Sequence, residues 1–115
     1  RRRLDGVKRG EVVTVALPGD YGKPRPAVIV QADLFNDTHA SVTVVPVTST
    51  LVNAPLFRLA VEPSPRNGLR TLSQLMVDKL TTVRRERVGA TIGVLEPDAA
   101  TRLNRALALW LGLAG

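Results

Sequence analysis

The sequence predicts a mainly β fold, in which a small barrel or strongly curved antiparallel sheet is closed by one C-terminal helix. Short runs rich in β-branched residues recur along the chain, and segments rich in Gly and Pro separate them. A long helical pattern of apolar residues follows at the C-terminal end. A chain of 115 residues suffices for one hydrophobic core but not for two, so we expect a single domain over residues 1–115.

Six segments carry the features of strands. In the first of them Val13, Val15 and Leu17 alternate with residues that face the other way. The second begins at Pro26, a position at which a strand tolerates proline. The predicted strands are Glu11–Leu17, Pro26–Gln31, Ser41–Pro46, Phe57–Val61, Arg70–Leu75 and Ala90–Leu95. Turn-forming residues between them, clearest in E-P-S-P-R-N-G (62–68), favour antiparallel connections.

Helical structure is predicted in three places. We expect a single turn at Asp33–Asn36, and a turn of helix rather than a strand in the charged segment Thr81–Val88. The long helix is predicted over Pro97–Leu113, because proline suits the first helical position and acidic residues suit the first turn. Its apolar face is expected to comprise Ala100, Leu103, Leu107, Trp110 and Leu111.

Composition narrows the possible functions. The chain has no cysteine and one histidine, His39, so we expect no disulfide, no metal site and no cofactor. No apolar run approaches the ~20 residues that span a bilayer, and we therefore expect a cytoplasmic protein without membrane contact. The net charge is +6, and basic residues gather at the N-terminal end, where residues 1–8 are expected to form a flexible basic lead-in.

One basic residue stands in an unusual place. Arg25 lies between Pro24 and Pro26, at the threshold of a strand that reads as buried. An arginine is costly to bury and needs no flanking prolines if it only faces water, so we infer that its direction is fixed. This pattern indicates a site without identifying its chemistry.

Four motifs follow one another along nearly the whole chain. They are K-R-G-E-V-V (8–13), G-K-P-R-P-A-V-I-V (22–30), V-V-P-V-T-S-T (44–50) and R-V-G-A-T-I-G-V-L (87–95), the last of which leads into the C-terminal helix. In this order and at these intervals they resemble the MazF/PemK toxins of bacterial type II toxin–antitoxin pairs. The resemblance covers one MazF/PemK-like toxin domain.

The resemblance implies an SH3-like barrel that forms a homodimer. It also implies a metal-independent endoribonuclease that cuts single-stranded RNA at short sequences, with mRNA as the first expectation and tRNA or rRNA as others. Attack by a 2′-hydroxyl would leave a 2′,3′-cyclic phosphate and a 5′-hydroxyl. A cognate antitoxin is implied as a further partner, with a tail that blocks the RNA groove.

By the same resemblance the catalytic residues are Arg25 and Thr48. Arginine suits a phosphate whose charge grows during reaction, because its fork of N–H groups fits two phosphate oxygens and stays protonated. A threonine hydroxyl adds one donor. The proton acceptor is left open between Asp20 and Asp78, and an acid–base role for Arg25 itself rests on the resemblance alone.

Other RNA-binding candidates lie beside these motifs. They are Tyr21, Lys23, Ser49, Asp78 and Lys79. Tyr21 is expected either to stack on a base or to cover the end of the barrel, and Lys23 either to attract phosphate or to remain solvated. Relatives carry an arginine where this chain has Thr81, so Lys79 or Arg84 would have to replace it.

Two other functions fit the same predicted fold. A CcdB-like gyrase poison would use a tryptophan near its C-terminus, and this chain has Trp110, although core or dimer packing explains that residue as well. A non-catalytic barrel that binds nucleic acid or protein is the second alternative. The joint presence of Arg25 and Thr48 favours the nuclease.

Overall fold

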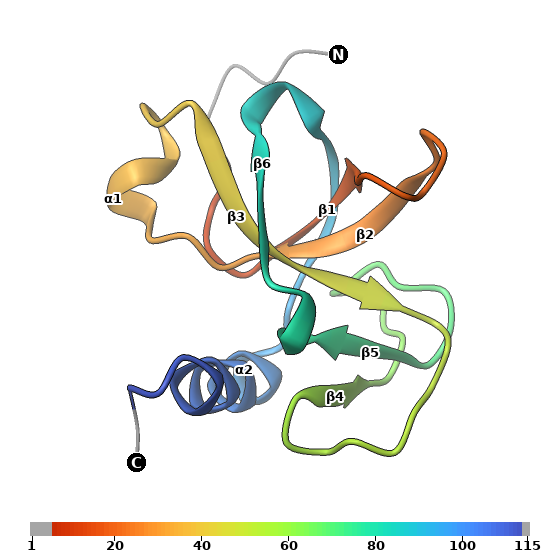
Figure 1. Cartoon of the computed structure of the whole chain (residues 1–115). Helices are drawn as coiled ribbons and strands as arrows, with labels where there is room; N and C mark the ends of the chain where they lie inside the picture. The colour runs from red at the N-terminus through yellow and green to blue at the C-terminus, as the bar shows by residue number, and fades with distance from the viewer. Residues whose placement is uncertain (1–5, 114–115) are drawn as a thin grey trace.

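The computed structural model describes residues 6–113, which form seven strands, two α-helices and two short 3-10 turns (Figure 1). The elements are β1 (Glu11–Ala16), β2 (Pro24–Ile29), α1 (Asp33–Asn36), β3 (Ser41–Thr48), β4 (Arg58–Val61), β5 (Ser73–Met76), η1 (Val77–Lys79), β6 (Thr81–Arg84), η2 (Arg85–Arg87), β7 (Val88–Val94) and α2 (Pro97–Trp110).

The strands form an antiparallel sheet in the order β4-β5-β3-β2-β1-β7, with β6 beside the first half of β3. Strand β3 runs through the middle of the molecule, as Figure 1 shows, and serves two layers. One edge of β3 pairs with β2, while its other edge pairs first with β6 and then, from Val47, with β5. The curved antiparallel sheet with a C-terminal helix is therefore confirmed, although β4 and β7 end the sheet without closing it.

Alternation along the central strands distributes apolar side chains between two cores. Val12, Val28 and Val45 lie in the core beneath α2, whereas Val13 and Ile29 lie in a second core on the opposite face. Successive side chains of a strand point to opposite faces, so one strand supplies both cores. This explains why these strands are rich in valine on both faces.

Helix α2 covers the first core with Ala99, Leu103, Ala106 and Leu107. The helix ends at Trp110, not at Leu113. Trp110 packs its ring against Phe57, with centroids 5.6 Å apart, yet it stays 48% exposed. The prediction that Trp110 lies on the apolar face of the helix is therefore correct in that its ring packs against Phe57, and wrong in that half of the side chain is exposed.

The expectation of a helical turn at Thr81–Val88 is wrong for its first half. The segment Thr81–Arg84 forms strand β6, and only Arg85–Arg87 adopts a 3-10 turn. Two threonines and a valine are β-branched, and the exposed edge of β3 offers them a complete ladder of partners. Pairing with β3 therefore makes this segment a strand, although its charged composition favours a helical turn.

The packed domain extends further toward the N-terminus than the predicted boundary. Val7 is buried in the second core, so the flexible lead-in does not reach residue 8. Residues 1–5 lie outside the described part. Among the helices of residues 6–113, none combines the length and the apolar character needed to cross a membrane.

Candidate active site

The site lies where β2 and β3 separate. Their pairing begins at Ala27 opposite Pro46, so the residues of β2 before Ala27 pair only with β1. Beyond Pro46, β3 pairs with β5. The two strands thus diverge like a fork, and Arg25 and Thr48 stand on its two arms.

The two prolines of β2 suit this fork. Ile29 accepts a hydrogen bond from the β1 side, and the next residue, Val30, donates to β3, so alternate residues face opposite edges. By this alternation Pro24 and Pro26 face the β3 edge, beyond the last residue pair that β2 makes with β3. Because proline has no N–H group, no donor is left unpaired there.

Arg25 is held from one side by Asp20. Its Nε donates to Asp20 Oδ2 at 2.7 Å and its Nη2 donates to Oδ1 at 3.0 Å. Nη1 also reaches across the fork to the carbonyl oxygen of Val47, at 3.4 Å. Arginine has five N–H groups, so one on each terminal nitrogen remains for a ligand.

A compact loop brings Asp20 into this contact. Asp20 N–H donates to Leu17 O and Lys23 N–H donates to Asp20 O, which gives two consecutive turns. Gly19 and Gly22 have positive φ angles, as such turns require, and Tyr21 between them has a φ of 53°. The loop therefore positions a carboxylate as well as the prolines that flank Arg25.

Thr48 ends β3 opposite Arg25. Its Oγ1 accepts a hydrogen bond from the backbone N–H of Thr50 at 3.1 Å, which stabilises the turn that follows the strand. That bond uses a lone pair and leaves the hydroxyl proton available. Thr48 thus serves the turn and still presents a donor.

Arg25 and Thr48 line one cavity of about 810 Å³. Its wall also includes Ser49, a predicted RNA-binding residue, and Arg70, which no sequence motif singles out. The remaining lining residues are Thr14, Pro24, Pro26, Val47, Thr50, Gly68, Leu69, Thr71, Ser73 and Ile92. The site combines two guanidinium groups with several hydroxyls over an apolar floor.

The other predicted RNA-binding residues lie outside this cavity. Tyr21 is 97% exposed, so the alternative that it covers the end of the barrel is wrong, while base stacking stays a prediction. Lys23 is exposed beside it in the same loop. Asp78 and Lys79 lie in η1, and neither lines the cavity of Arg25.

Asp78 has a structural partner instead. Arg58 Nε donates to Asp78 Oδ1 at 2.7 Å and Nη2 donates to Oδ2 at 3.0 Å. Both side chains are mostly buried, at 14% and 16% exposure. The hydrogen bond from Arg58 holds the pKa of Asp78 below its ordinary value, which does not suit a proton acceptor near neutral pH.

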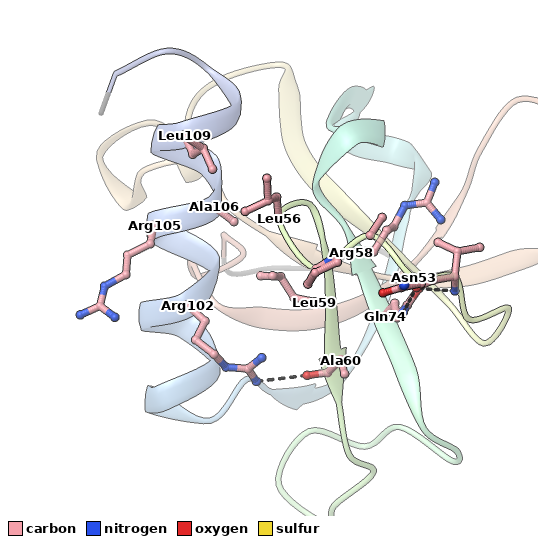
Figure 2. A pocket seen from close by; sticks show the side chains of 13 residues that line it. Asn53, Leu56, Arg58, Leu59, Ala60, Gln74, Arg102, Arg105, Ala106 and Leu109 are labelled. Carbon is pink, nitrogen blue, oxygen red and sulfur yellow. Dashed lines mark hydrogen bonds between the residues drawn. The ribbon is translucent and has the colours of Figure 1, made fainter. Parts of the chain in front are cut away.

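A second hollow lies between α2, β4 and the loop before β4, and Figure 2 shows it from close by. It has a volume of about 560 Å³ and a largely apolar wall that includes Leu56, Leu59 and Leu109. Arg102 donates to Ala60 O at 3.1 Å and so covers part of the β4 edge. It contains neither Arg25 nor Thr48.

Comparisons with known proteins agree with this architecture. A family model described as PemK-like, MazF-like toxin of type II toxin–antitoxin system matches residues 8–111. A "Probable endoribonuclease MazF" of Mycolicibacterium smegmatis is 48% identical over 110 residues, which cover 95% of this chain and all of that protein.

Solved structures show the same fold. An endoribonuclease in complex with its cognate antitoxin, from a mycobacterial species, superposes with a TM-score of 0.80 at 28% identity, covering 95% of this chain and 98% of that one. MazF in a MazE–MazF structure from Deinococcus radiodurans gives 0.76 at 18% identity, covering 95% and 99%, and supports the fold alone. The chain belongs to the PemK-like, MazF-like toxin family of type II toxin–antitoxin systems.

Proposed function

We propose that the chain is the toxin of a type II pair and acts as a sequence-specific, metal-independent endoribonuclease on single-stranded RNA. The family assignment and the 48% identical relative support the class of activity. The observation that carries the proposal is the shared cavity in which Arg25 and Thr48 present unused donors from two diverging strands.

The proposed reaction exchanges one phosphodiester bond for another. The 2′-hydroxyl oxygen of the substrate bonds to phosphorus and the bond from phosphorus to the 5′-oxygen breaks. The 2′-hydroxyl proton passes to a base, and the leaving 5′-oxygen takes up a proton. The products are a 2′,3′-cyclic phosphate and a 5′-hydroxyl, and no oxidant or metal is needed for the balance.

We assign charge stabilisation to Arg25 and Thr48. The two free terminal N–H groups of Arg25 match two non-bridging phosphate oxygens. Because Asp20 already holds the guanidinium in place, these donors need not move when the phosphate gains charge. The hydroxyl of Thr48 adds a third donor from the opposite arm. Proton transfer is not assigned to Arg25, because a guanidinium group keeps its protons in proteins.

The test uses purified protein and a long single-stranded RNA in EDTA, followed by mapping of the new ends. We expect defined cuts with 5′-hydroxyl ends, loss of cutting in Arg25→Ala and a strong decrease in Thr48→Ala. Arg87→Ala, which removes an exposed arginine of η2 outside the cavity, is the matched control. Intact RNA with gyrase-dependent DNA breaks would establish the CcdB-like function instead. Intact RNA without such DNA breaks would indicate a non-catalytic binding module.

We further propose a cytoplasmic homodimer that a cognate antitoxin inhibits. Exposed apolar side chains gather on the loop before β4 and on the last turn of α2, and they include Leu56, Leu109 and Trp110. In a two-fold dimer the same patch comes from both copies, so apolar surface meets apolar surface. Light scattering at micromolar protein should give twice the chain mass, and Leu56→Glu should give the monomer; a wild-type monomer that cuts RNA would contradict this assembly.

A further inference from the structure

The cavity has no surplus positive charge at Arg25. Asp20 contributes a carboxylate in direct contact with the guanidinium, so this pair is neutral as a unit. The charged residues that line the cavity are Arg25 and Arg70. Arg70 therefore supplies the net charge that a polyanion meets there.

Arg70 is free to take a ligand. It is exposed, and within residues 6–113 its side chain makes no hydrogen bond or ion pair. Its backbone, by contrast, is fixed. The neighbouring Leu69 is buried, and its N–H donates to Asn67 Oδ1 at 3.0 Å.

Asn67 makes this loop rigid. It is fully buried and its side-chain amide donates to Glu62 O at 2.9 Å and to Glu96 Oε1 at 3.0 Å. Gly68 follows with a φ of 72° and packs directly against the carbonyl of Ile92. A mobile arginine head on a fixed base is suited to binding phosphate from a defined direction.

The topology separates Arg70 from Arg25. Arg25 lies on β2 and Arg70 lies three residues before β5, and the end of β3 with Thr48 runs between these strands. The two arginines therefore reach the cavity from different elements, which favours two different phosphates over one.

We propose that Arg70 forms a second phosphate subsite, which binds the RNA phosphate next to the one cleaved at Arg25. Cleavage of the neighbouring phosphate rests on the proposed nuclease function, whereas phosphate binding at Arg70 does not depend on it. Thr71, which lines the same side of the cavity, adds a hydroxyl to the subsite. Arg70 thus holds the strand in register while Arg25 acts on the reacting phosphate.

The experiment measures binding separately from cleavage. Single-stranded DNA of the same sequence keeps the phosphates but lacks the attacking 2′-hydroxyl, so it serves as an uncleaved probe. For Arg70→Ala we expect about tenfold weaker binding, as for loss of one charged hydrogen-bonded contact, and a slope of log K against log salt that is less steep by about 0.7. Arg70→Lys should recover most of the affinity.

The matched control is Arg66→Ala, in the same loop and with the same charge but outside the cavity. On RNA, Arg70→Ala should raise KM and leave kcat nearly unchanged. Equal affinities and equal salt slopes for Arg70→Ala and Arg66→Ala would overturn the subsite, even if wild-type protein cuts RNA. Wild-type protein that fails to cut RNA, while DNA binding still depends on Arg70, would overturn the nuclease and leave the subsite standing.

Discussion

Asp20 and Arg25 form a two-bond ion pair at the mouth of the fork between β2 and β3, with N–O distances of 2.7 and 3.0 Å. The carboxylate binds the edge of the guanidinium that Nε and Nη2 form. The edge formed by the two terminal nitrogens is left toward the cavity. Asp20 is therefore a positioning residue for Arg25. Its charge also lowers the attraction of the site for RNA, and these two effects can be measured apart.

We predict that Asp20→Asn lowers kcat about tenfold or more, because an amide oxygen replaces only one of two charged acceptors and Arg25 loses its orientation. The same variant should bind single-stranded DNA as tightly as the wild type or more tightly, because a negative charge leaves the site. Asp98→Asn, on exposed α2 surface, should change neither value. Weaker binding together with an unchanged kcat would contradict the positioning role.

For the ion pair of Arg58 and Asp78 we predict a structural effect. Asp78→Ala leaves a mostly buried guanidinium without its partner and should lower the free energy of unfolding by about 1–3 kcal/mol. Urea unfolding measures this loss, and Glu86→Ala, at an exposed acid, is the control. RNA cleavage by Asp78→Ala at a temperature where it is folded should match the wild type; a selective loss of cleavage would restore the sequence-based role of Asp78 at the RNA site.

Acid should destabilise the fold through carboxylates whose pKa values are lowered, Asp78 and Glu96 among them. Hydrogen bonds from Arg58 to Asp78 and from Ser64 to Glu96 hold both pKa values below the ordinary 3.8 and 4.5. A lowered pKa stabilises the folded state above the ordinary pKa, and this contribution is lost as the pH falls through the folded value. The free energy of unfolding should therefore decline below about pH 4.5, and less steeply in Glu96→Gln than in Glu62→Gln. Parallel declines in the two variants would refute the linkage.

Gly68 offers a test of the loop that carries Arg70. An added Cβ would collide with the backbone of Ile92, and the positive φ disfavours alanine in addition. Gly10 has a positive φ of 91° too, but open space where its Cβ would stand. We expect Gly10→Ala to lower the free energy of unfolding by about 1–2 kcal/mol, because the backbone conformation is strained for alanine. Gly68→Ala should lower it by a further ~1–3 kcal/mol through overpacking. Equal thermal stabilities of the two variants would argue against this tight contact.

Local patterns predicted most of the fold. The alternation of Val13 and Val15, the proline at position 97 and the turn at 62–68 act over a few residues, and each element formed where they stand. The segment Thr81–Val88 failed this reasoning because its strand exists only through pairing with β3. Element ends also moved, since β5 begins at Ser73 rather than Arg70, opposite Val61, at which its partner β4 ends.

The sequence by itself determined most of the strand and helix pattern and, through its motifs, the family. Only the tertiary structure decided the partners of the charged groups. Asp20 pairs with Arg25 and Asp78 pairs with Arg58, and the cavity includes Arg70 but neither Lys79 nor Arg84. The reason is physical: backbone preferences act between neighbours in the chain, whereas an ion pair depends on which strands lie side by side.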